Sequence, residues 1–284
     1  MLYLYTRGEF LPVDAPVLRI GHRGFRFADG FFETIRVFNG KPLYLEHHFS
    51  RILDAIKVYR LERDLDFTLQ RLEREIMQLL RRNHISEGGR IRITFSRQGD
   101  GFYLPDSNVL DYIIEARPLD NLRFALNEEG RVTELYTEIK KDINKLSMFK
   151  NIDSNLYVLA SIFARENNLH DVLIQNYKGG IIESTTSNIF LVSNGVLYTP
   201  GIEDGPIAGV MRMQVINLAL EHKIKIYECT INPQNLLAAD ELFLTNAIQG
   251  IQWVGSYRTK RYYNDMAHRI TSLLNDQAAR LTAG

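Results

Sequence analysis

The chain has 284 residues, of which 34 are basic and 34 are acidic, so its formal net charge at pH 7 is zero. A neutral chain exerts no overall attraction on nucleic acid or on an anionic membrane surface. The single cysteine, Cys229, excludes an internal disulfide and a zinc site built from several cysteines. With 45% hydrophobic and 24% charged residues, the composition is that of a folded globular protein.

The N-terminus and the apolar runs show no targeting or membrane-spanning pattern. The first ten residues, MLYLYTRGEF, lack the basic region and long apolar stretch of a secretory signal. The longest apolar run, residues 157–164, is interrupted by Ser161 and falls short of the roughly 18 residues that a membrane span needs. We therefore expect a cytoplasmic protein.

Residues 1–116 predict a small N-terminal α/β domain. Hydrophobic periodicity and turn residues indicate two hairpins, two helices and two further strands. In chain order, the hairpins are expected at 1–12 and 31–45, the helices at 45–58 and 69–83, and the strands at 89–96 and 109–116. A loop rich in Gly and Asp, 98–106, separates the last two strands.

Residues 117–123 are mostly polar and contain Pro118, so we expect an interdomain linker there. A larger C-terminal domain, 124–284, is then expected to alternate strands and helices. Helices are expected at 155–168, 207–222 and 264–281, and strands at 171–175, 181–190, 196–198, 224–229 and 241–245. The predicted fold class is therefore α/β or α+β in two domains.

Several familiar site patterns are missing or incomplete. The seven histidines show no metal-ligand spacing, so no metal is expected. Neither a P-loop nor a Gly-x-Gly-x-x-Gly follows a predicted strand. Ser147 and Lys150 match the Ser-x-x-Lys pattern of penicillin-binding serine enzymes, but the companion Ser-Asp-Asn and Lys-Thr-Gly motifs are absent.

Lys150 instead belongs to a set of features that suits a phosphate-bearing cofactor. Glu183 begins a short run of small hydroxyl side chains within an apolar strand region. Residues 209–212 lie in the first turn of a predicted helix, where free N–H groups and the helix dipole attract phosphate. A second turn, 245–250, follows a predicted strand and offers further donors. One lysine, one carboxylate and two such turns are what a pyridoxal phosphate site needs.

Over nearly its whole length, the chain resembles the class IV, or fold type IV, pyridoxal phosphate enzymes. These include branched-chain and D-amino-acid transaminases and aminodeoxychorismate lyase. The similar motifs are RGFRFADGFFET at 23–34, His48-Phe49-Ser50-Arg51, and Glu183 followed by Ser187-Asn188-Ile189-Phe190. The resemblance implies a small N-terminal domain, a larger C-terminal domain with a barrel-like sheet, pyridoxal 5′-phosphate as cofactor, and a homodimer.

The resemblance also implies roles for individual residues. Lys150 would be the catalytic lysine that holds the cofactor and moves the substrate proton, with Lys140, Lys141 and Lys145 as rivals. Glu183 would face the pyridine nitrogen, and Arg51 would contact the phosphate. The remaining expected cofactor contacts are Ser187, Asn188, Gly209, Val210, Met211, Thr245 and Asn246.

Three departures from the family pattern are visible. Met211 replaces the usual threonine, so that only its backbone N–H could bind phosphate. Asn155, with Tyr157 nearby, stands in place of the tyrosine of branched-chain transaminases. A clean equivalent of either known carboxylate-binding motif is missing.

Two reactions on small-molecule substrates are left open. A transaminase would move the amino group of a branched-chain or similar amino acid to a 2-oxo acid, and we favour it. The alternative is a 4-amino-4-deoxychorismate lyase that releases p-aminobenzoate and pyruvate, whose loop motifs resemble residues 96–105 and 245–251. A binding protein on the same scaffold would have lost Lys150 or Glu183. Expected substrate-binding residues are Arg97, Phe27, Phe31 and Tyr103.

Overall fold

The computed structural model describes residues 1–283, and the chain divides into two compact units. Unit 1 comprises Met1–Arg123, Phe149–Asp153 and the chain from Ala278 onward, and unit 2 comprises Phe124–Met148 and Ser154–Gln277. The expected linker therefore ends where the first long stretch of unit 1 ends. Lys150 belongs to unit 1, whereas Glu183 belongs to unit 2.

Two segments lie in a different unit from the one that the sequence suggested. Residues 149–153 and the C-terminal residues were expected in the larger domain, but both group with unit 1. The first segment runs beside a strand of unit 1, where the Phe32 N–H donates to the Lys150 carbonyl oxygen at 2.8 Å. In the C-terminal segment, Thr282 Oγ1 accepts from Asn39 Nδ2 of the same unit at 2.9 Å.

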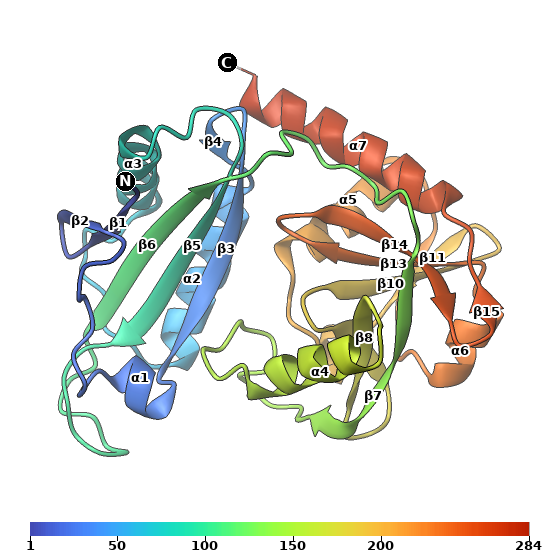
Figure 1. Ribbon diagram of the computed structural model, residues 1–284, viewed down its shortest axis with the longest axis horizontal. Coiled ribbons are helices and arrows are strands. Elements are labelled where there is room, and N and C mark those ends of the chain that lie inside the picture. Colours follow the sequence, from blue (N-terminus) through green and yellow to red (C-terminus); the bar gives the residue numbers. More distant parts are fainter. Residues whose placement is uncertain (284) are drawn as a thin grey trace. The chain divides into compact units, whose positions relative to one another are not determined.

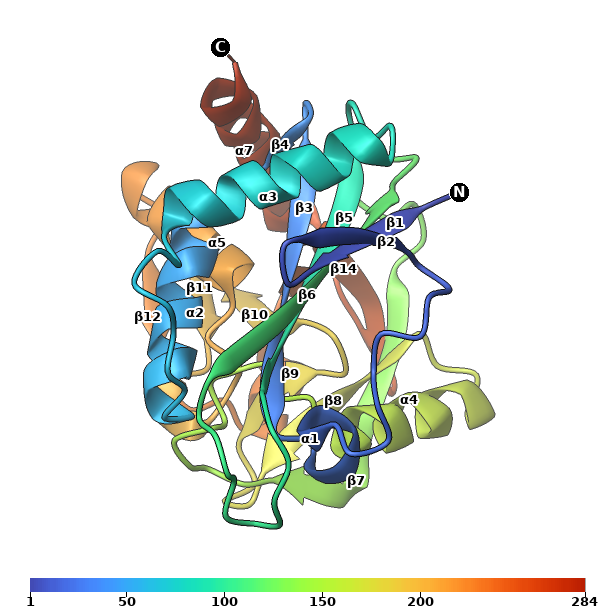
Figure 2. The ribbon, with the colours of Figure 1, turned by 90° about the vertical axis from the view of Figure 1, so that its left-hand side faces the viewer.

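Unit 1 is built on a six-stranded sheet with two helices packed against it. The strands lie in the order β2-β1-β6-β5-β3-β4. Their bounds are β1 Tyr3–Thr6, β2 Glu9–Pro12, β3 Gly30–Phe38, β4 Lys41–Pro42, β5 Gly89–Arg97 and β6 Leu110–Pro118. Helices α2 (Leu45–Val58) and α3 (Leu69–Arg82) pack on the sheet and on each other, and Figure 2 shows α3 lying across the strands. A short helix, α1 (Arg23–Phe27), precedes β3.

Local sequence explains these elements. Helix α3 buries Leu72, Ile76 and Leu79 at helical spacing, and the Thr68 side chain caps its first turn by accepting from the Arg71 N–H. The turn between β3 and β4 has a positive φ at both Asn39 and Gly40, as a two-residue hairpin turn requires.

Unit 2 contains a nine-stranded sheet, whose strands are coloured from green to red in Figure 1. Six of these strands form a closed ring. The ring follows the pairs β7–β8, β8–β9, β9–β10, β10–β13, β13–β14 and β14–β7. The ring strands are β7 Arg131–Lys141, β8 Asp171–Asn176, β9 Ile181–Ser184, β10 Asn188–Ser193, β13 Glu241–Asn246 and β14 Gly250–Tyr257. The barrel-like sheet that the resemblance implied is thus confirmed.

The remaining strands and the helices of unit 2 surround this ring. The outer strands are β11 Val196–Thr199, β12 Ile226–Glu228 and β15 Lys260–Arg261. The helices are α4 Asn155–Glu166, η1 Ile202–Asp204, α5 Val210–Glu221, α6 Pro233–Ala238 and α7 Asp265–Thr282, whose last turn belongs to unit 1. Within residues 1–283, we find no helix that combines the length and apolar character of a membrane span.

Several elements of unit 2 were not expected from the sequence, and two strands that are separate were expected as one. Strand β7 was not expected, because only Thr133 and Tyr136 of its eleven residues are buried and its apolar signal is weak. Strand β14 was also missed. The region 181–190 is not one strand, since Thr185 donates through both its N–H and its Oγ1 to Asp171, which breaks the ladder between β9 and β10.

Candidate functional site

Glu183 lies on β9 with its carboxylate buried, since the residue is only 2% exposed. Its Oε1 accepts from Lys141 Nζ at 2.7 Å and from the Tyr157 hydroxyl at 2.8 Å. Its Oε2 accepts from the Ile207 N–H at 2.8 Å. A buried carboxylate is costly unless a cation and hydrogen-bond donors compensate its charge, and this one has both.

The neighbouring groups also fix the direction of these bonds. Burial raises the pKa of the Tyr157 hydroxyl, and the nearby Glu183 charge raises it further. Tyr157 therefore remains a neutral phenol that donates a hydrogen bond to the carboxylate.

The start of helix α5 is also determined near Glu183. Ile207 is held by Glu183 through its N–H and by Asn188 Nδ2 through its carbonyl, so α5 begins at Val210 and not at the expected residue 207.

The start of α5 meets the start of β10 in a place suited to an anion. Asn188 pairs with Thr245 across β10 and β13, and a Cβ added at Gly209 would collide with Asn188 Oδ1. Gly209 is the N-cap residue of α5, and it has no side chain that could cap the helix. Val210 and Met211 follow in the first turn. Backbone N–H groups at a helix N-terminus are a ready anion site.

Two hydroxyls complete this cradle. Thr245 Oγ1 is buried, and it has no hydrogen-bond partner among the described residues. Ser187 Oγ accepts from Asn246 Nδ2 at 3.0 Å. The Asn246 side chain also shapes the following turn, because its Oδ1 accepts from the N–H groups of Ile248 and Gln249. A buried hydroxyl without a partner is unusual, and it suits a bound oxyanion.

Unit 1 carries a second buried charge cluster, centred on Glu33 of β3. The Arg51 guanidinium donates from Nε and Nη2 to the two oxygens of Glu33, both at 2.7 Å. His48 Nδ1 lies 2.7 Å from Glu33 Oε2. Burial alone raises the pKa of Glu33, but the Arg51 charge and the His48 contact outweigh it and lower the pKa to about 2. Arg51, the expected phosphate ligand, is therefore oriented by a carboxylate of its own unit.

Lys150 lies beside β3 in the same unit. Its segment pairs with the strand through an isolated bridge between Phe31 and Asn151, and the Ile152 N–H donates to the Gly30 carbonyl oxygen at 3.1 Å. The Lys150 Nζ lies 5.4 Å from the centre of the Phe32 ring, and its charge lowers the pKa of His48, though less than burial does.

The three rival lysines lie elsewhere. Lys141 is engaged with Glu183, whereas Lys140 and Lys145 are exposed.

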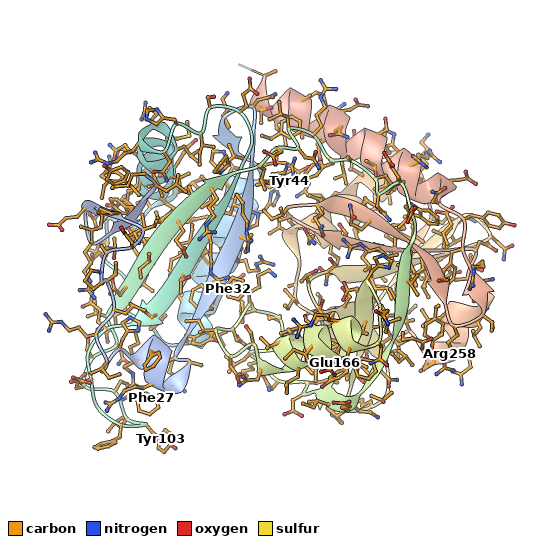
Figure 3. All side chains as sticks on the ribbon, in the orientation of Figure 1. Phe27, Phe32, Tyr44, Tyr103, Glu166 and Arg258 are labelled. Carbon is orange, nitrogen blue, oxygen red and sulfur yellow. The ribbon has the colours of Figure 1, made fainter. Side chains whose placement is uncertain are left out.

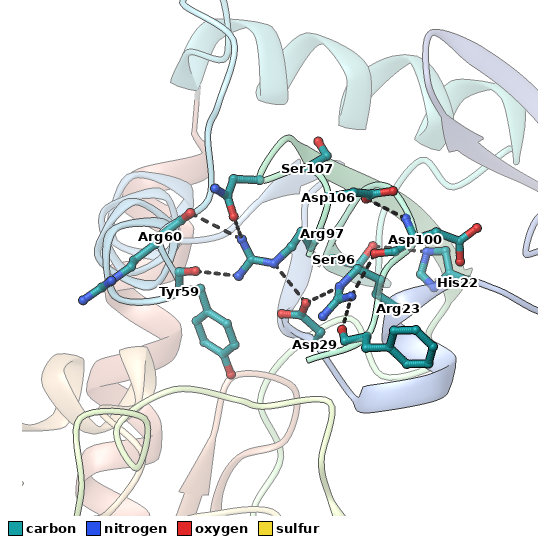
Figure 4. Close-up of polar contacts among 12 residues, drawn as sticks. His22, Arg23, Asp29, Tyr59, Arg60, Ser96, Arg97, Asp100, Asp106 and Ser107 are labelled. Carbon is teal, nitrogen blue, oxygen red and sulfur yellow. Dashed lines mark hydrogen bonds and ion pairs between the residues drawn. The ribbon is translucent and has the colours of Figure 1, made fainter. Parts of the chain in front are cut away.

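Arg97, the expected substrate ligand, is 8% exposed, and its guanidinium is bonded to its own unit (Figure 4). Its Nε donates to Asp29 Oδ2 at 2.9 Å, and its Nη2 donates to the Tyr59 carbonyl oxygen at 2.7 Å. Its Nη1 donates to Asn108 Oδ1 at 2.5 Å, at the end of the loop that follows β5. Arg23 holds the other part of this loop by donating to the carbonyl oxygens of residues 100 and 102.

The aromatic residues expected at the substrate lie in two environments. Phe31 is 1% exposed and stacks on Phe95 at 4.8 Å between ring centres, so it belongs to the core of unit 1. Phe27 and Tyr103 lie together at one end of unit 1, 5.8 Å between ring centres (Figure 3). Tyr103 is 91% exposed. The substrate roles of these residues and of Arg97 stay predictions.

Sequence reasoning assigned no role to several residues of the two clusters. Glu33 and His48 stand inside the quoted motifs, and the motifs were the signal that could have identified them. Lys141 was weighed only as a rival to Lys150. A predicted strand at 131–141 would not have revealed its contact with Glu183, because the register aligns Tyr136 with Ile174 and Glu183, and Lys141 pairs with Asn176 beyond a register shift.

Comparison with known proteins identifies relatives of the whole chain. Residues 30–257 match the family model described as "Amino-transferase class IV". A "Putative branched-chain-amino-acid aminotransferase" of Methanocaldococcus jannaschii is 28% identical, with 96% of this chain and 94% of that protein aligned. A "D-alanine aminotransferase" of Staphylococcus epidermidis is 26% identical over 87% of this chain and 86% of that protein.

Solved structures show the same fold. The branched-chain aminotransferase of Thermoproteus uzoniensis superposes with a TM-score of 0.88 at 22% identity, covering 96% of this chain and 93% of that one. A putative 4-amino-4-deoxychorismate lyase from Legionella pneumophila gives 0.83 at 23% identity, covering 93% and 96%. An aminotransferase from Brucella abortus, solved with its cofactor PLP, gives 0.85 at 19% identity, covering 97% and 98%. The chain therefore belongs to the class IV aminotransferase family, and it is a pyridoxal phosphate-dependent enzyme.

Proposed function

We propose that this class IV aminotransferase moves the amino group of a branched-chain or similar amino acid to a 2-oxo acid. The observation that carries the proposal is the buried Glu183 carboxylate, which lies in the same unit as an anion cradle. That cradle contains a buried Thr245 hydroxyl with no hydrogen-bond partner in the described part of the chain. A carboxylate and an anion cradle are the two features that a pyridine ring with a phosphate group needs. The alignment of nearly the whole chain with a putative branched-chain aminotransferase supports the choice of reaction.

The residues present fit the cofactor. In unit 2, Glu183 would accept the proton of the ring nitrogen. The phosphate would be held by the N–H groups of Val210 and Met211 and by the Thr245 hydroxyl, with Ser187, Asn188, Gly209 and Asn246 shaping the cradle. In unit 1, Arg51 would add a positive charge that Glu33 keeps in place. When bound, pyridoxal phosphate withdraws electrons from the Cα of the amino acid and so makes its proton acidic.

Lys150 is the residue that we assign to covalent attachment of the cofactor and to moving the Cα proton. An amine serves both purposes, because it is a nucleophile towards a carbonyl and, when neutral, a base. Reduction with borohydride should fix the cofactor on its lysine, and peptide mapping should then find the label on Lys150. A label on Lys140, Lys141 or Lys145 would contradict the assignment.

A lyase that acts on 4-amino-4-deoxychorismate is the second candidate. The fold match to a putative lyase supports it, as do the loop residues 96–105 and the turn 245–251. The deciding assay offers a panel of L- and D-amino acids with 2-oxoglutarate, and aminodeoxychorismate in a separate reaction. Glutamate formed from branched-chain amino acids is the expected result. Release of p-aminobenzoate and pyruvate without any glutamate would overturn the transaminase proposal.

The panel also tests chirality, because one relative is named a D-alanine aminotransferase. Glutamate formed only from D-amino acids would replace the branched-chain substrate class.

We further propose a homodimer that works in amino-acid metabolism in the cytoplasm, without nucleic-acid or membrane partners. Cell fractionation tests the location, and a membrane-bound pool of active enzyme would contradict it.

A further inference from the structure

Lys141 has no part in the proposed chemistry, although its ammonium lies against the carboxylate that would meet the cofactor ring. It is the last residue of β7, and its Nζ donates to Glu183 Oε1 at 2.7 Å and to the Ser147 carbonyl oxygen at 3.0 Å. Its side chain is largely buried. Among residues 1–283, it is the cation that forms a salt bridge with Glu183.

The donors around Glu183 are divided unequally between its two oxygens. Within the residues that the structure describes, Oε1 accepts from both Lys141 and Tyr157, whereas Oε2 accepts only from the Ile207 N–H. Each carboxylate oxygen offers about two acceptor positions. Oε1 is therefore saturated, and Oε2 keeps one position for a further donor.

Lys141 also lies on the wrong side to be the lysine that binds the cofactor covalently. In the pyridoxal ring, the carbon that reacts with a lysine amine stands opposite the ring nitrogen. A lysine held against the carboxylate that meets the nitrogen cannot also reach that carbon. The position of Lys141 beside Glu183 therefore suits a role at the nitrogen end of the ring.

We propose that Lys141 is a positioning residue that sets how tightly Glu183 holds the ring nitrogen and its proton. The inference rests on the proposed function, in which Glu183 faces that nitrogen. The Lys141 ammonium occupies Oε1 together with the Tyr157 hydroxyl, so Oε2 is the oxygen presented to the ring. Its positive charge also offsets the charge of Glu183, so the neutral pair attracts a protonated ring less strongly than a lone buried carboxylate does.

Besides Lys141, two groups from the packed elements face Glu183, and neither carries a charge. Tyr157 on α4 is a neutral donor, and the Ile207 N–H is fixed in the backbone before α5. Both stay in place when Lys141 is replaced, so they keep the carboxylate in position. The charge is then the main property that the replacement removes.

The test compares two ligands in equilibrium binding to the full chain freed of cofactor. One is pyridoxamine 5′-phosphate, which carries an amine and forms no bond to lysine. The other is its analogue in which a CH group replaces the ring nitrogen. We define the preference ratio as the Kd of the analogue divided by the Kd of pyridoxamine 5′-phosphate. This ratio isolates the ring nitrogen, because all other contacts are shared and a general structural change affects both ligands alike.

Lys141→Met and Lys141→Gln should each raise the preference for the nitrogen-bearing ligand by about tenfold or more, because an opposing charge close to the ring is lost. Gln keeps a hydrogen-bond donor, so it separates the charge from the positioning contact. Lys141→Arg should restore the wild-type ratio. Lys140→Met is the matched control, since Lys140 is the neighbouring exposed lysine of β7, and its ratio should not change.

An unchanged or smaller ratio in both Lys141→Met and Lys141→Gln, with native circular dichroism, overturns the role of Lys141. If Lys141→Met does not fold, Lys141→Gln alone decides. Glu183→Gln tests the underlying function separately. It should reduce the preference strongly, and a preference that survives in Glu183→Gln means that Glu183 does not face the ring nitrogen.

Discussion

Buried carboxylates with a cation from a distant part of the chain recur in both units. Glu33 is held by Arg51 of α2, and Glu183 is held by Lys141 of β7. In both, desolvation opposes the charge, and a paired cation with further donors compensates for it. The sequence supplied both carboxylates and Arg51 as parts of motifs, but Lys141 comes from a stretch whose neighbouring residues give no sign of the pairing.

The Glu33 cluster makes a prediction about acid stability. The pKa of Glu33 is lowered from 4.5 to about 2 in the folded chain, so its stabilisation is complete above about 4.5 and is lost as the pH falls towards 2. That difference corresponds to about 3 kcal/mol. Glu33→Gln should lower the free energy of unfolding at neutral pH and flatten its decline between pH 4.5 and 2, measured by urea denaturation.

Glu46→Gln provides the control for this experiment, because Glu46 is an exposed carboxylate on α2. It should leave the acid dependence of unfolding as it is in the wild type. An identical pH profile in Glu33→Gln and the wild type would show that the Glu33 cluster does not stabilise the fold in this range.

At the scale of elements, two segments owe their shape to side chains that satisfy backbone groups. Helix α5 starts at Val210 because the residues before it are bonded to Glu183 and Asn188. The loop after β5 is held by Arg97 and Arg23, which donate to its carbonyl and amide oxygens (Figure 4). In neither segment did the local sequence alone determine the shape: the start of α5 and the path of the loop both depend on these side-chain contacts.

Gly209→Ala should disturb the anion cradle. The new Cβ would collide with Asn188 Oδ1, so either the start of α5 or the start of β10 must move. We expect the Kd for pyridoxamine 5′-phosphate to rise by about tenfold or more, because the N–H groups of the first turn lose their alignment. Gly180→Ala is the control, since its Cβ would lie 3.3 Å from two side-chain atoms and needs only a small shift. Equal affinities in the two variants would mean that Gly209 does not shape the cradle.

Arg97→Lys should loosen the loop that follows β5. Lysine keeps the positive charge but cannot make the separate contacts to Asp29, Tyr59 and Asn108. Amide hydrogen exchange across residues 98–108 should become faster by about tenfold or more without any substrate present. Arg90→Lys, at an exposed position of the same strand, should leave the exchange unchanged. Unchanged exchange in the loop of Arg97→Lys would mean that the contacts of Arg97 do not hold the loop.

At the scale of the whole molecule, zero net charge fits an enzyme whose charges act locally and in pairs. The division into units was only partly visible in the sequence. The stretch 117–123 was identified as a boundary, but the return of residues 149–153 to unit 1 was not. That return depends on backbone hydrogen bonds that join Lys150 and Ile152 to the start of β3, a strand that is far from both residues in sequence.

The proposed homodimer predicts the mass in solution. Light scattering on the purified protein should give about twice the chain mass of 32.8 kDa. The measurement should be repeated over a range of protein concentrations, because a weak dimer dissociates on dilution. A mass equal to one chain at every concentration would remove the homodimer from the proposal.

The sequence by itself determined the family motifs and most elements whose signal is local. Helices α2 and α3 follow from their apolar spacing, and the hairpin at Asn39-Gly40 follows from its turn residues. Glu183 could be singled out in the same way, because it stands in a motif of short range, whereas Lys150 stood out through its combination with Glu183 and the turns at 209–212 and 245–250. Local burial patterns and turn preferences are properties of a few consecutive residues, so they can be read without the fold.

Only the tertiary structure decided which side chains share an environment. The six-stranded ring closes through β7, whose weak apolar pattern concealed it, and through the pairing of β9 with β10. That closure brings Lys141 to Glu183, 42 residues apart in sequence, and determines that Oε2 is the oxygen left with an acceptor position. The physical reason is that a buried ion pair is selected by the desolvation of both partners, which depends on the whole packed unit and not on the sequence around either residue.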